Sequence, residues 1–405
     1  SVEDAQRGGE MPLERAMYLE QALAQRKGIS LDVPKALSEW MRRLEDAQKT
    51  QVEPPRGLCA ELRPYQRTGL SWLSALSDAG FGGILADDMG LGKTVQALAC
   101  LAATGTFPAL IVVPPHLLRN WQAEAARFLR IKGRPPRVCV LTGLKPYQPP
   151  EADIYIIHYL LLRGWKQALP QMGFRTVIFD EIQELRHGGT EKYSAASLLA
   201  EECERVIGLS GTPIYNKGSE IWNVVNILDF HCLGDWESFT RAWCDGYGNH
   251  LVRDPALLGD HLRREGLILR RTKQEVLTEL PPKRRLVQEI DADDKVYREL
   301  MRPVIEMLGS LRALHPEARE RAMLEDQVGR GERQATGVAK APFVAAFVRA
   351  LLDNGEKVLL FAHHHAVMDI YKKELTSYHP AFLTGRETTK QKDDAVARFM
   401  EGKTN

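Results

Sequence analysis

The sequence lacks the features that mark several large classes of protein. No run within its 405 residues approaches the roughly 18 consecutive apolar residues that a membrane-spanning helix needs, so no such helix is predicted. The six cysteines are scattered and include no Cys-x-x-Cys pair, which argues against structural zinc and against a disulfide framework. Scattered thiols are typical of a reducing compartment, and we expect a cytoplasmic protein.

Neither sign of charge is in excess. Lysine and arginine total 54 and aspartate and glutamate total 53, which leaves a net charge of +1. No overall field therefore attracts a polyanion, and any nucleic-acid site must be local. The best local candidate is 263–285, "RREGLILRRTKQEVLTELPPKRR", with eight basic residues against three glutamates. The same pattern also fits a solvated helix face followed by a linker.

Changes in pattern along the chain predict four segments. Residues 1–55 have helical spacing and form a helical lead-in, and 56–215 alternate between short apolar runs and helix-like stretches. Residues 216–340 are mainly helical, with a polar, glycine-containing stretch at 325–340 that we expect to be a mobile loop. Residues 341–405 begin a second α/β unit that is expected to be incomplete.

Continuous apolar runs in the second segment predict a parallel sheet covered by helices on both faces. The predicted strands are 82–86, 109–114, 137–142, 153–158, 176–180 and 205–210. Two further strands are predicted at 357–362 and 381–385, in the last segment. The predicted class is thus α/β.

The stretch "LADDMGLGKT" at 85–94 resembles a phosphate-binding loop between a strand and a helix. Gly90 and Gly92 would let backbone N–H groups approach phosphate oxygens. Lys93 would contact the β- and γ-phosphates, and Thr94 would ligate Mg²⁺. The strict pattern has a glycine where this chain has Asp87, and a plain glycine-rich turn is the alternative.

Two further stretches place chemistry at strand ends. In "VIFDEIQ", Asp180 is suited to hold Mg²⁺ and Glu181 to orient the attacking water, although an acidic pair also caps helices. In "GLSGTPIYN", the small residues Ser210, Gly211 and Thr212 suit either a turn or a relay that couples hydrolysis to movement.

These motifs, in this order, resemble the SWI/SNF-like family of superfamily 2 helicase-like ATPases. Further stretches carry the resemblance over most of 60–405: "LRPYQ", "LIVVPPHLLRNWQAEAARF", "LRRTKQEV", "EKVLLFAHHHAVMDIYKKEL" and "LTGRETTKQKDDAVARF". The resemblance implies two RecA-like lobes, and ATP with Mg²⁺ as cofactors. The first glycine of the loop is commonly lost in this superfamily.

The resemblance also implies roles for single residues. Arg63 and Gln66 would bind the adenine, Asp88 and Met89 would belong to the nucleotide loop, and Gln183 would line the nucleotide site where the family usually has histidine. Because bacterial members often carry glutamine there, a bacterial source is expected. The family's later arginine motifs are not found in these 405 residues, so we expect slow turnover of bound ATP.

By the same resemblance the partner is double-stranded DNA, held through its backbone without sequence preference. The candidate DNA contacts are His116, Arg119, His158, Tyr159, Arg271, Lys273 and His363. The run His363–His365 is poorly arranged for a metal, because neighbouring residues of an extended chain point in alternate directions. Two alternatives remain open. One is the helicase or motor of a restriction or antiviral defence complex with other subunits, and the other is a nucleotide-gated DNA-binding module without turnover.

Overall fold

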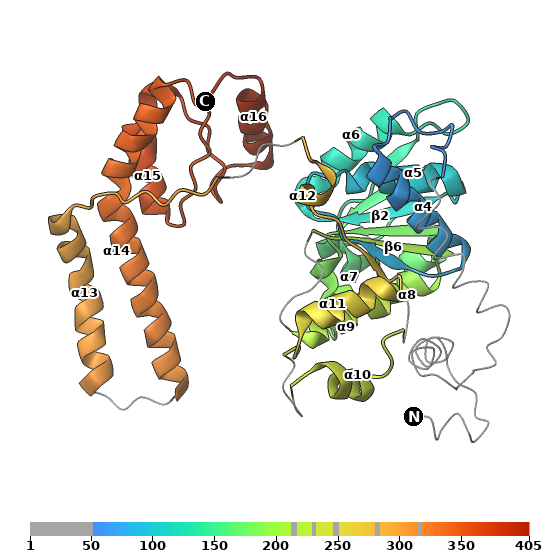
Figure 1. The fold of residues 1–405 in the computed structure, drawn as a ribbon, viewed down its shortest axis with the longest axis horizontal. Coiled ribbons are helices and arrows are strands. Elements are labelled where there is room, and N and C mark those ends of the chain that lie inside the picture. Colours follow the sequence, from blue (N-terminus) through green and yellow to red (C-terminus); the bar gives the residue numbers. More distant parts are fainter. Residues whose placement is uncertain are drawn as a thin grey trace. The chain divides into compact units, whose positions relative to one another are not determined.

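The computed structural model describes residues 52–211, 217–228, 232–245, 251–279, 284–313 and 318–404 (Figure 1). The chain divides into two compact units, Ser1–Leu280 and Pro281–Asn405, which are described separately. The predicted boundaries at 215 and 340 fall inside these units. Almost all of the predicted helical lead-in, 1–51, lies outside the described residues.

The first unit is built on one parallel sheet of seven strands in the order β3-β4-β2-β5-β6-β1-β7. The strands are β1 (Gly83–Leu85), β2 (Ala109–Val113), β3 (Val138–Val140), β4 (Ile154–His158), β5 (Thr176–Asp180), β6 (Arg205–Leu209) and β7 (Ile268–Leu269). The six strands predicted before residue 215 are confirmed, as is the α/β class.

Strand β7 was not predicted, because two residues are too short to produce a period in the sequence. It extends the sheet beyond β1 by backbone hydrogen bonds that continue past the strand itself. Ala86 N donates to Leu269 O over 2.7 Å, and Asp88 N donates to Arg271 O over 3.0 Å. The chain after β7 is thereby fixed beside the loop after β1.

Helices cover both faces of the sheet, as the continuous burial of its strands requires. The helices are α4 (Pro64–Asp78), α5 (Lys93–Thr104), α6 (Leu118–Phe128), α7 (Leu162–Trp165), α8 (Glu191–Glu201), α9 (Gly218–Leu228), α10 (Trp236–Trp243), α11 (Pro255–Arg264) and α12 (Lys273–Val276). Alternate residues of β2 face opposite cores: Ile111 packs in the core that includes residues of α4, α5 and α6, and Val112 packs in the core that includes residues of α7, α8, α9 and α11. Single 3₁₀ turns are η1 (Pro115–Leu117), η2 (Tyr159–Leu161), η3 (Leu169–Met172) and η4 (Ile182–Leu185).

The described part of the second unit is helical. It contains α13 (Asp294–Ala313), α14 (Ala318–Asp353), α15 (His365–Glu374), η5 (Thr376–Tyr378) and α16 (Thr389–Met400). A small core joins α14 to α15 through Ala345, Val348, Val367 and Tyr371.

Two predictions for this unit are wrong. The segments 357–362 and 381–385 are not strands, since no backbone ladder pairs them within the described residues. An apolar run forms a strand only beside a partner edge, and here Leu359 and Phe361 are 67% and 87% exposed.

The stretch 325–340 is not a loop but the middle of α14. Its glycines suggested flexibility, yet α13 and α14 run side by side (Figure 1). A Cβ atom on Gly331 would stand 2.6 Å from Val304 Cγ2 on α13. The glycine therefore permits close helix packing that the sequence alone does not show.

Among the described residues one helix, Met323–Asp353, is long and apolar enough to cross a membrane by length and composition alone. In the structure this part of α14 packs against α13 and α15. A helix in the core of a folded unit passes the same test, so the feature carries no further conclusion.

Candidate nucleotide site

The loop between β1 and α5 has the backbone geometry of a phosphate cradle. Gly90 and Gly92 have φ of 86° and 76°, in the left-handed region that favours glycine. Gly92 also allows a close approach, because a Cβ there would stand 2.5 Å from Gln66 Nε2. The 12-residue helix α5 starts directly afterwards at Lys93, so its free N–H groups and positive dipole end face the loop.

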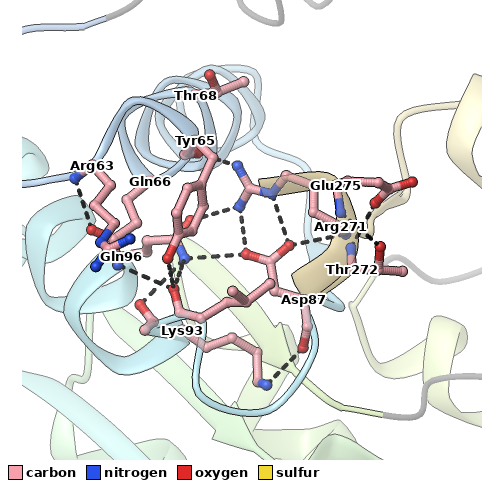
Figure 2. A network of polar contacts seen from close by, with 12 residues as sticks. Arg63, Tyr65, Gln66, Thr68, Asp87, Lys93, Gln96, Arg271, Thr272 and Glu275 are labelled. Atoms are coloured by element: carbon pink, nitrogen blue, oxygen red, sulfur yellow. Dashed lines mark hydrogen bonds and ion pairs between the residues drawn. The ribbon is translucent and has the colours of Figure 1, made fainter. Parts of the chain in front are cut away.

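The Lys93 side chain binds the backbone of the same loop. Its Nζ donates to the backbone oxygen of Asp87 over 2.8 Å (Figure 2). Burial lowers the pKa of Lys93, and the nearby carboxylates of Glu181 and Asp180 act in the opposite direction. The loop after β1 and the acidic pair after β5 thus meet at the carboxyl edge of the sheet, since only β6 lies between the two strands.

Asp180 is held at the end of β5 by donors from two elements. Trp121 Nε1, on α6, donates to Asp180 Oδ2 over 2.7 Å, and Glu181 N donates to Oδ1 over 3.0 Å. Tyr159 Oη donates to the Asp180 backbone oxygen over 2.8 Å. Burial raises the pKa of Asp180, partly offset by the Trp121 hydrogen bond. Such a carboxylate gains most from a cation placed beside it.

Glu181 is one of three non-glycine residues with positive φ in the described chain, at φ 52° and ψ 53°. A left-handed conformation costs a residue with a Cβ roughly 1–2 kcal/mol, and such strain is concentrated at functional sites. Here it turns the chain sharply between the buried strand and η4, which leaves Asp180 and Glu181 at the same sheet edge.

Gln183 connects the acidic pair to the loop after β6. Its Nε2 donates to Glu181 Oε2, and its Oε1 accepts from Ser210 Oγ over 2.7 Å. Gly211 is packed against the nucleotide loop, because a Cβ there would stand 3.2 Å from Met89 Cγ. The predicted coupling residues are therefore next to both motifs, except Thr212, which lies outside the described residues.

Asp87, the residue in place of the first glycine, has a structural role. Its side chain has no exposed surface, and its carboxylate forms an ion pair with Arg271 (Figure 2). Arg271 Nε donates to Asp87 Oδ1 over 2.8 Å, and Gln96 Nε2 donates to Oδ2 over 3.2 Å. The departure from the strict pattern thus anchors the segment after β7 to the nucleotide loop.

The motif at 62–66 completes this network. Gln66 Oε1 accepts from Arg63 N over 2.9 Å, and its Nε2 donates to Leu91 O over 3.1 Å. One amide hydrogen and one lone pair remain, which is enough for the predicted two-point contact with adenine. Tyr65 Oη also reaches Leu91 O, over 3.2 Å, and the Arg63 guanidinium pairs with Glu279 over 2.6 Å.

The structure separates the predicted DNA contacts. Tyr159 is 2% exposed and supports Asp180, so its predicted contact with DNA is wrong. Arg271 is likewise wrong as a DNA contact, because its guanidinium is occupied by Asp87, Gln96 and the Tyr65 carbonyl. The other candidates stay predictions: His116 and Arg119 are exposed, and His158 is half-buried.

The remaining two candidates are exposed. Lys273 lies at Gly90 of the nucleotide loop. His363, in the second unit, makes an edge-to-face contact with His364 at a centroid distance of 4.9 Å.

Sequence reasoning missed Trp121 and Gln96. Both are fully buried and both bind carboxylates of the site. Trp121 lies in the stretch "LIVVPPHLLRNWQAEAARF". Because a buried indole N–H needs an acceptor, a polar partner could have been expected. Gln96 comes four residues after Gly92, on the first turn of α5, and its position on the buried face was the available signal.

A cavity of about 400 Å³ opens beside η4 and α9. Arg186, His187, Trp222 and Asn223 contribute to its lining. It contains no residue of the 87–94 loop, so it is separate from the nucleotide site.

The donor set fits a Mg²⁺-bound nucleoside triphosphate. Backbone N–H groups and Lys93 suit phosphate oxygens, and the Thr94 hydroxyl with the Asp180 carboxylate suits a hard cation. Mg²⁺ usually needs only one or two protein ligands, because phosphates and water supply the others.

Comparison with known proteins agrees with this geometry. The family profile of the SNF2-related domain matches residues 65–323. The chain belongs to the SNF2-related family. The predicted SWI/SNF-like relationship is thereby confirmed.

The relatives of this SNF2-related chain are named as ATP-dependent helicases and ATPases. One relative is YwqA of Bacillus subtilis (strain 168), which is named as a candidate ATP-dependent helicase/translocase. It is 27% identical over 415 residues, covering 92% of this chain and 43% of YwqA. The chromatin-remodelling ATPase INO80 of Sclerotinia sclerotiorum is 30% identical over 280 residues, covering 61% of this chain and 16% of INO80. The chain therefore spans less than half the length of these relatives.

A solved structure supports the fold. The SWI2/SNF2 ATPase core of Sulfolobus solfataricus, in complex with double-stranded DNA, aligns with a TM-score of 0.51 and 23% identity. The alignment covers 86% of this chain and 77% of that one.

Proposed function

We propose that this SNF2-related chain is the ATPase part of a DNA translocase, which hydrolyses ATP to move along double-stranded DNA without separating its strands. The observation that carries the proposal is the meeting of three strand ends. The Lys93 ammonium, the Asp180–Glu181 carboxylates and the Gln183–Ser210 hydrogen bond lie at one sheet edge.

The residues divide the chemistry between them. Backbone N–H groups of 90–94 and Lys93 bind the β- and γ-phosphates, and Arg63 with Gln66 orients the adenine. Thr94 and Asp180 hold Mg²⁺, which when bound neutralises charge that develops on the phosphate oxygens. Glu181 orients the attacking water and accepts its proton. Gln183 passes the change at Glu181 to Ser210 and the loop after β6.

Double-stranded DNA is the proposed partner because the solved relative of similar fold holds it. The names of the curated relatives, a helicase/translocase and a remodelling ATPase, favour the same class of substrate. Contacts to the phosphate backbone would make binding sensitive to salt and insensitive to sequence. His116 and Arg119, exposed after β2, are the first residues to test. A cytoplasmic location, with the nucleoid as the site of action in a bacterium, is part of the proposal.

The deciding experiment measures ATP hydrolysis with and without duplex DNA, for the wild type, Glu181→Gln and Lys93→Ala. We expect stimulation by duplex DNA and a loss of about 10²-fold or more in turnover for Glu181→Gln. If Glu181→Gln kept the wild-type turnover, Glu181 would not orient the attacking water. If duplex DNA did not stimulate hydrolysis, the translocase proposal would be wrong.

Two alternatives give different results in the same assay. Unwinding of a forked substrate would favour the motor of a defence complex. DNA binding that changes with ATP, without any turnover, would favour a nucleotide-gated module. Slow turnover of bound ATP stays a prediction, and the rate of hydrolysis measured in the same assay tests it.

A further inference from the structure

Lys273 lies against the nucleotide loop, and among the residues that the structure describes its ammonium has no bonded partner. Its Nζ and Cε lie 3.5 and 3.6 Å from the point where a Cβ atom on Gly90 would stand. The side chain is exposed, and within the described residues no hydrogen bond or ion pair involves its Nζ. An ammonium therefore stands at a glycine whose backbone is shaped to receive phosphate.

The position of Lys273 is fixed by its backbone. Lys273 N donates to Asp88 Oδ2 over 3.1 Å, and Asp88 N donates to Arg271 O over 3.0 Å. The Asp87–Arg271 ion pair holds the preceding turn (Figure 2). The next turn is held by Thr272, whose N–H donates to Glu275 Oε2 over 2.6 Å. The lysine is thus anchored at the loop, and only its side chain is free to adjust.

The charges around the loop indicate what this ammonium would bind. The carboxylates of Asp88, Asp180 and Glu181 surround Lys93, whose ammonium is already bonded to the Asp87 backbone oxygen. A nucleoside triphosphate carries more negative charge than one lysine and one Mg²⁺ neutralise. A second ammonium at Gly90 supplies the missing positive charge, and lysine is suited to phosphate as a point charge.

We propose that Lys273 binds a phosphate oxygen of the bound nucleotide, and that residues 271–279 thereby respond to the nucleotide. This proposal rests on the proposed function, because it requires the loop at 87–94 to bind nucleotide. Lys273 would contact the phosphates from the start of α12, after the edge strand β7, whereas Lys93 would contact them from α5. Residues 271–279 lead to the second unit, so a phosphate contact here places the outgoing chain under control of the nucleotide.

The test is equilibrium binding of ATP, ADP and adenosine to the whole chain with Mg²⁺, for Lys273→Gln, Lys273→Arg and two reference variants. Lys145→Gln removes an exposed lysine from the loop after β3, away from the site. Lys93→Ala removes the lysine of the loop itself. We expect Lys273→Gln to weaken ATP about tenfold and leave adenosine unchanged, with Lys273→Arg close to wild type. Lys145→Gln should match wild type for all three ligands.

Each outcome decides between named interpretations. If Lys93→Ala weakens ATP and Lys273→Gln does not, this proposal is wrong and the nucleotide site stands. If neither variant changes ATP binding, the proposed nucleotide function itself fails. If Lys273→Gln leaves ATP unchanged but weakens duplex DNA binding without nucleotide, Lys273 is a DNA contact, as its sequence context first suggested.

Discussion

The Asp87 carboxylate, which has no exposed surface, is paired with the Arg271 guanidinium 184 residues later in the chain. The pair joins the nucleotide loop to the segment after β7, and Gln96 completes it with bonds to both partners. A buried ion pair does not by itself guarantee stability, because removing two charges from water costs free energy. Leaving one partner alone is the more serious loss.

Replacing Asp87 by glycine, which restores the strict phosphate-loop pattern, is therefore expected to damage the protein. Asp87→Gly and Asp87→Ala should each lower the free energy of unfolding of the first unit by about 3–5 kcal/mol, since Arg271 stays buried without its partner. Calorimetric unfolding measures the loss.

The control uses an exposed ion pair of the same unit. Arg175 and Glu204 are 45% and 52% exposed, so Glu204→Ala should cost under about 1 kcal/mol. The double variant Asp87→Ala/Arg271→Ala should cost less than the sum of the single variants. Additive losses, or a stable Asp87→Gly protein, would show that the pair does not hold the loop.

The strands and the loop were predictable because their signals are local. The run 109–114 is apolar throughout and 177–179 is apolar up to Asp180, and Gly90, Gly92 and Lys93 stand at fixed spacing between a strand and a helix. The role of Asp87 was not predictable, because its partner Arg271 is distant in sequence and is brought near only when β7 pairs with β1. Trp121 reaches Asp180 for the same kind of reason.

The errors had a similar origin. The stretch 325–340 has the composition of a loop, and only its packing against α13 makes it a helix. Arg271 was predicted as a DNA contact from a basic local sequence, which carries no information on whether a charge is already paired. Local composition predicts elements, whereas the partners of a charged side chain depend on the fold.

Ser210 should affect coupling more than nucleotide binding. It is fully buried and its hydroxyl donates to Gln183 Oε1, which links the loop after β6 to Glu181. Ser210→Ala should reduce the stimulation of ATP hydrolysis by duplex DNA about 5- to 150-fold, which corresponds to the roughly 1–3 kcal/mol of a lost buried hydrogen bond, and leave the Kd for ATP unchanged.

Gln183→Ala and the double variant complete the test of this link. If Ser210 acts through Gln183, duplex DNA should stimulate the Ser210→Ala/Gln183→Ala double variant no less than Gln183→Ala alone. The Ser210–Gln183 hydrogen bond is already lost in the single variant. Steady-state hydrolysis with titrated DNA measures the effect. Full stimulation in Ser210→Ala, or losses that simply add, would place coupling elsewhere.

Two glycines of the helical pair α13 and α14 should respond in opposite ways to alanine. Gly331→Ala places a methyl group 2.6 Å from Val304 Cγ2, so the Val304 side chain or the helices must shift, at a cost of about 1–3 kcal/mol. Gly309→Ala meets no atom within 4 Å, and the better helix propensity should stabilise α13 by about 1 kcal/mol. Amide hydrogen exchange along both helices measures the two changes. Equal protection in the two variants would contradict the packing.

The last prediction concerns pH and compares two aspartates whose pKa values are shifted in opposite directions. Burial raises the pKa of Asp180 above its ordinary value of 3.8, so its ionised form costs stability at neutral pH. Asp180→Asn should raise the unfolding midpoint at pH 7, and this gain should shrink as the pH falls through the raised pKa towards 3.8. The same variant should weaken Mg²⁺-dependent ATP binding by about 10–100-fold.

Asp153 is the control of opposite sign. Hydrogen bonds from Arg134, over 2.7 and 3.0 Å, are the largest cause of its lowered pKa. Its ionised form therefore stabilises the protein above pH 3.8, and that contribution is lost as the pH falls through the lowered pKa. Asp153→Asn should lower the midpoint by a similar amount from pH 7 to pH 4, because the contribution of Asp153 begins to fall only below pH 3.8. Midpoints measured from pH 7 to pH 4 compare the two variants, and shifts of the same sign would show that burial does not control Asp180.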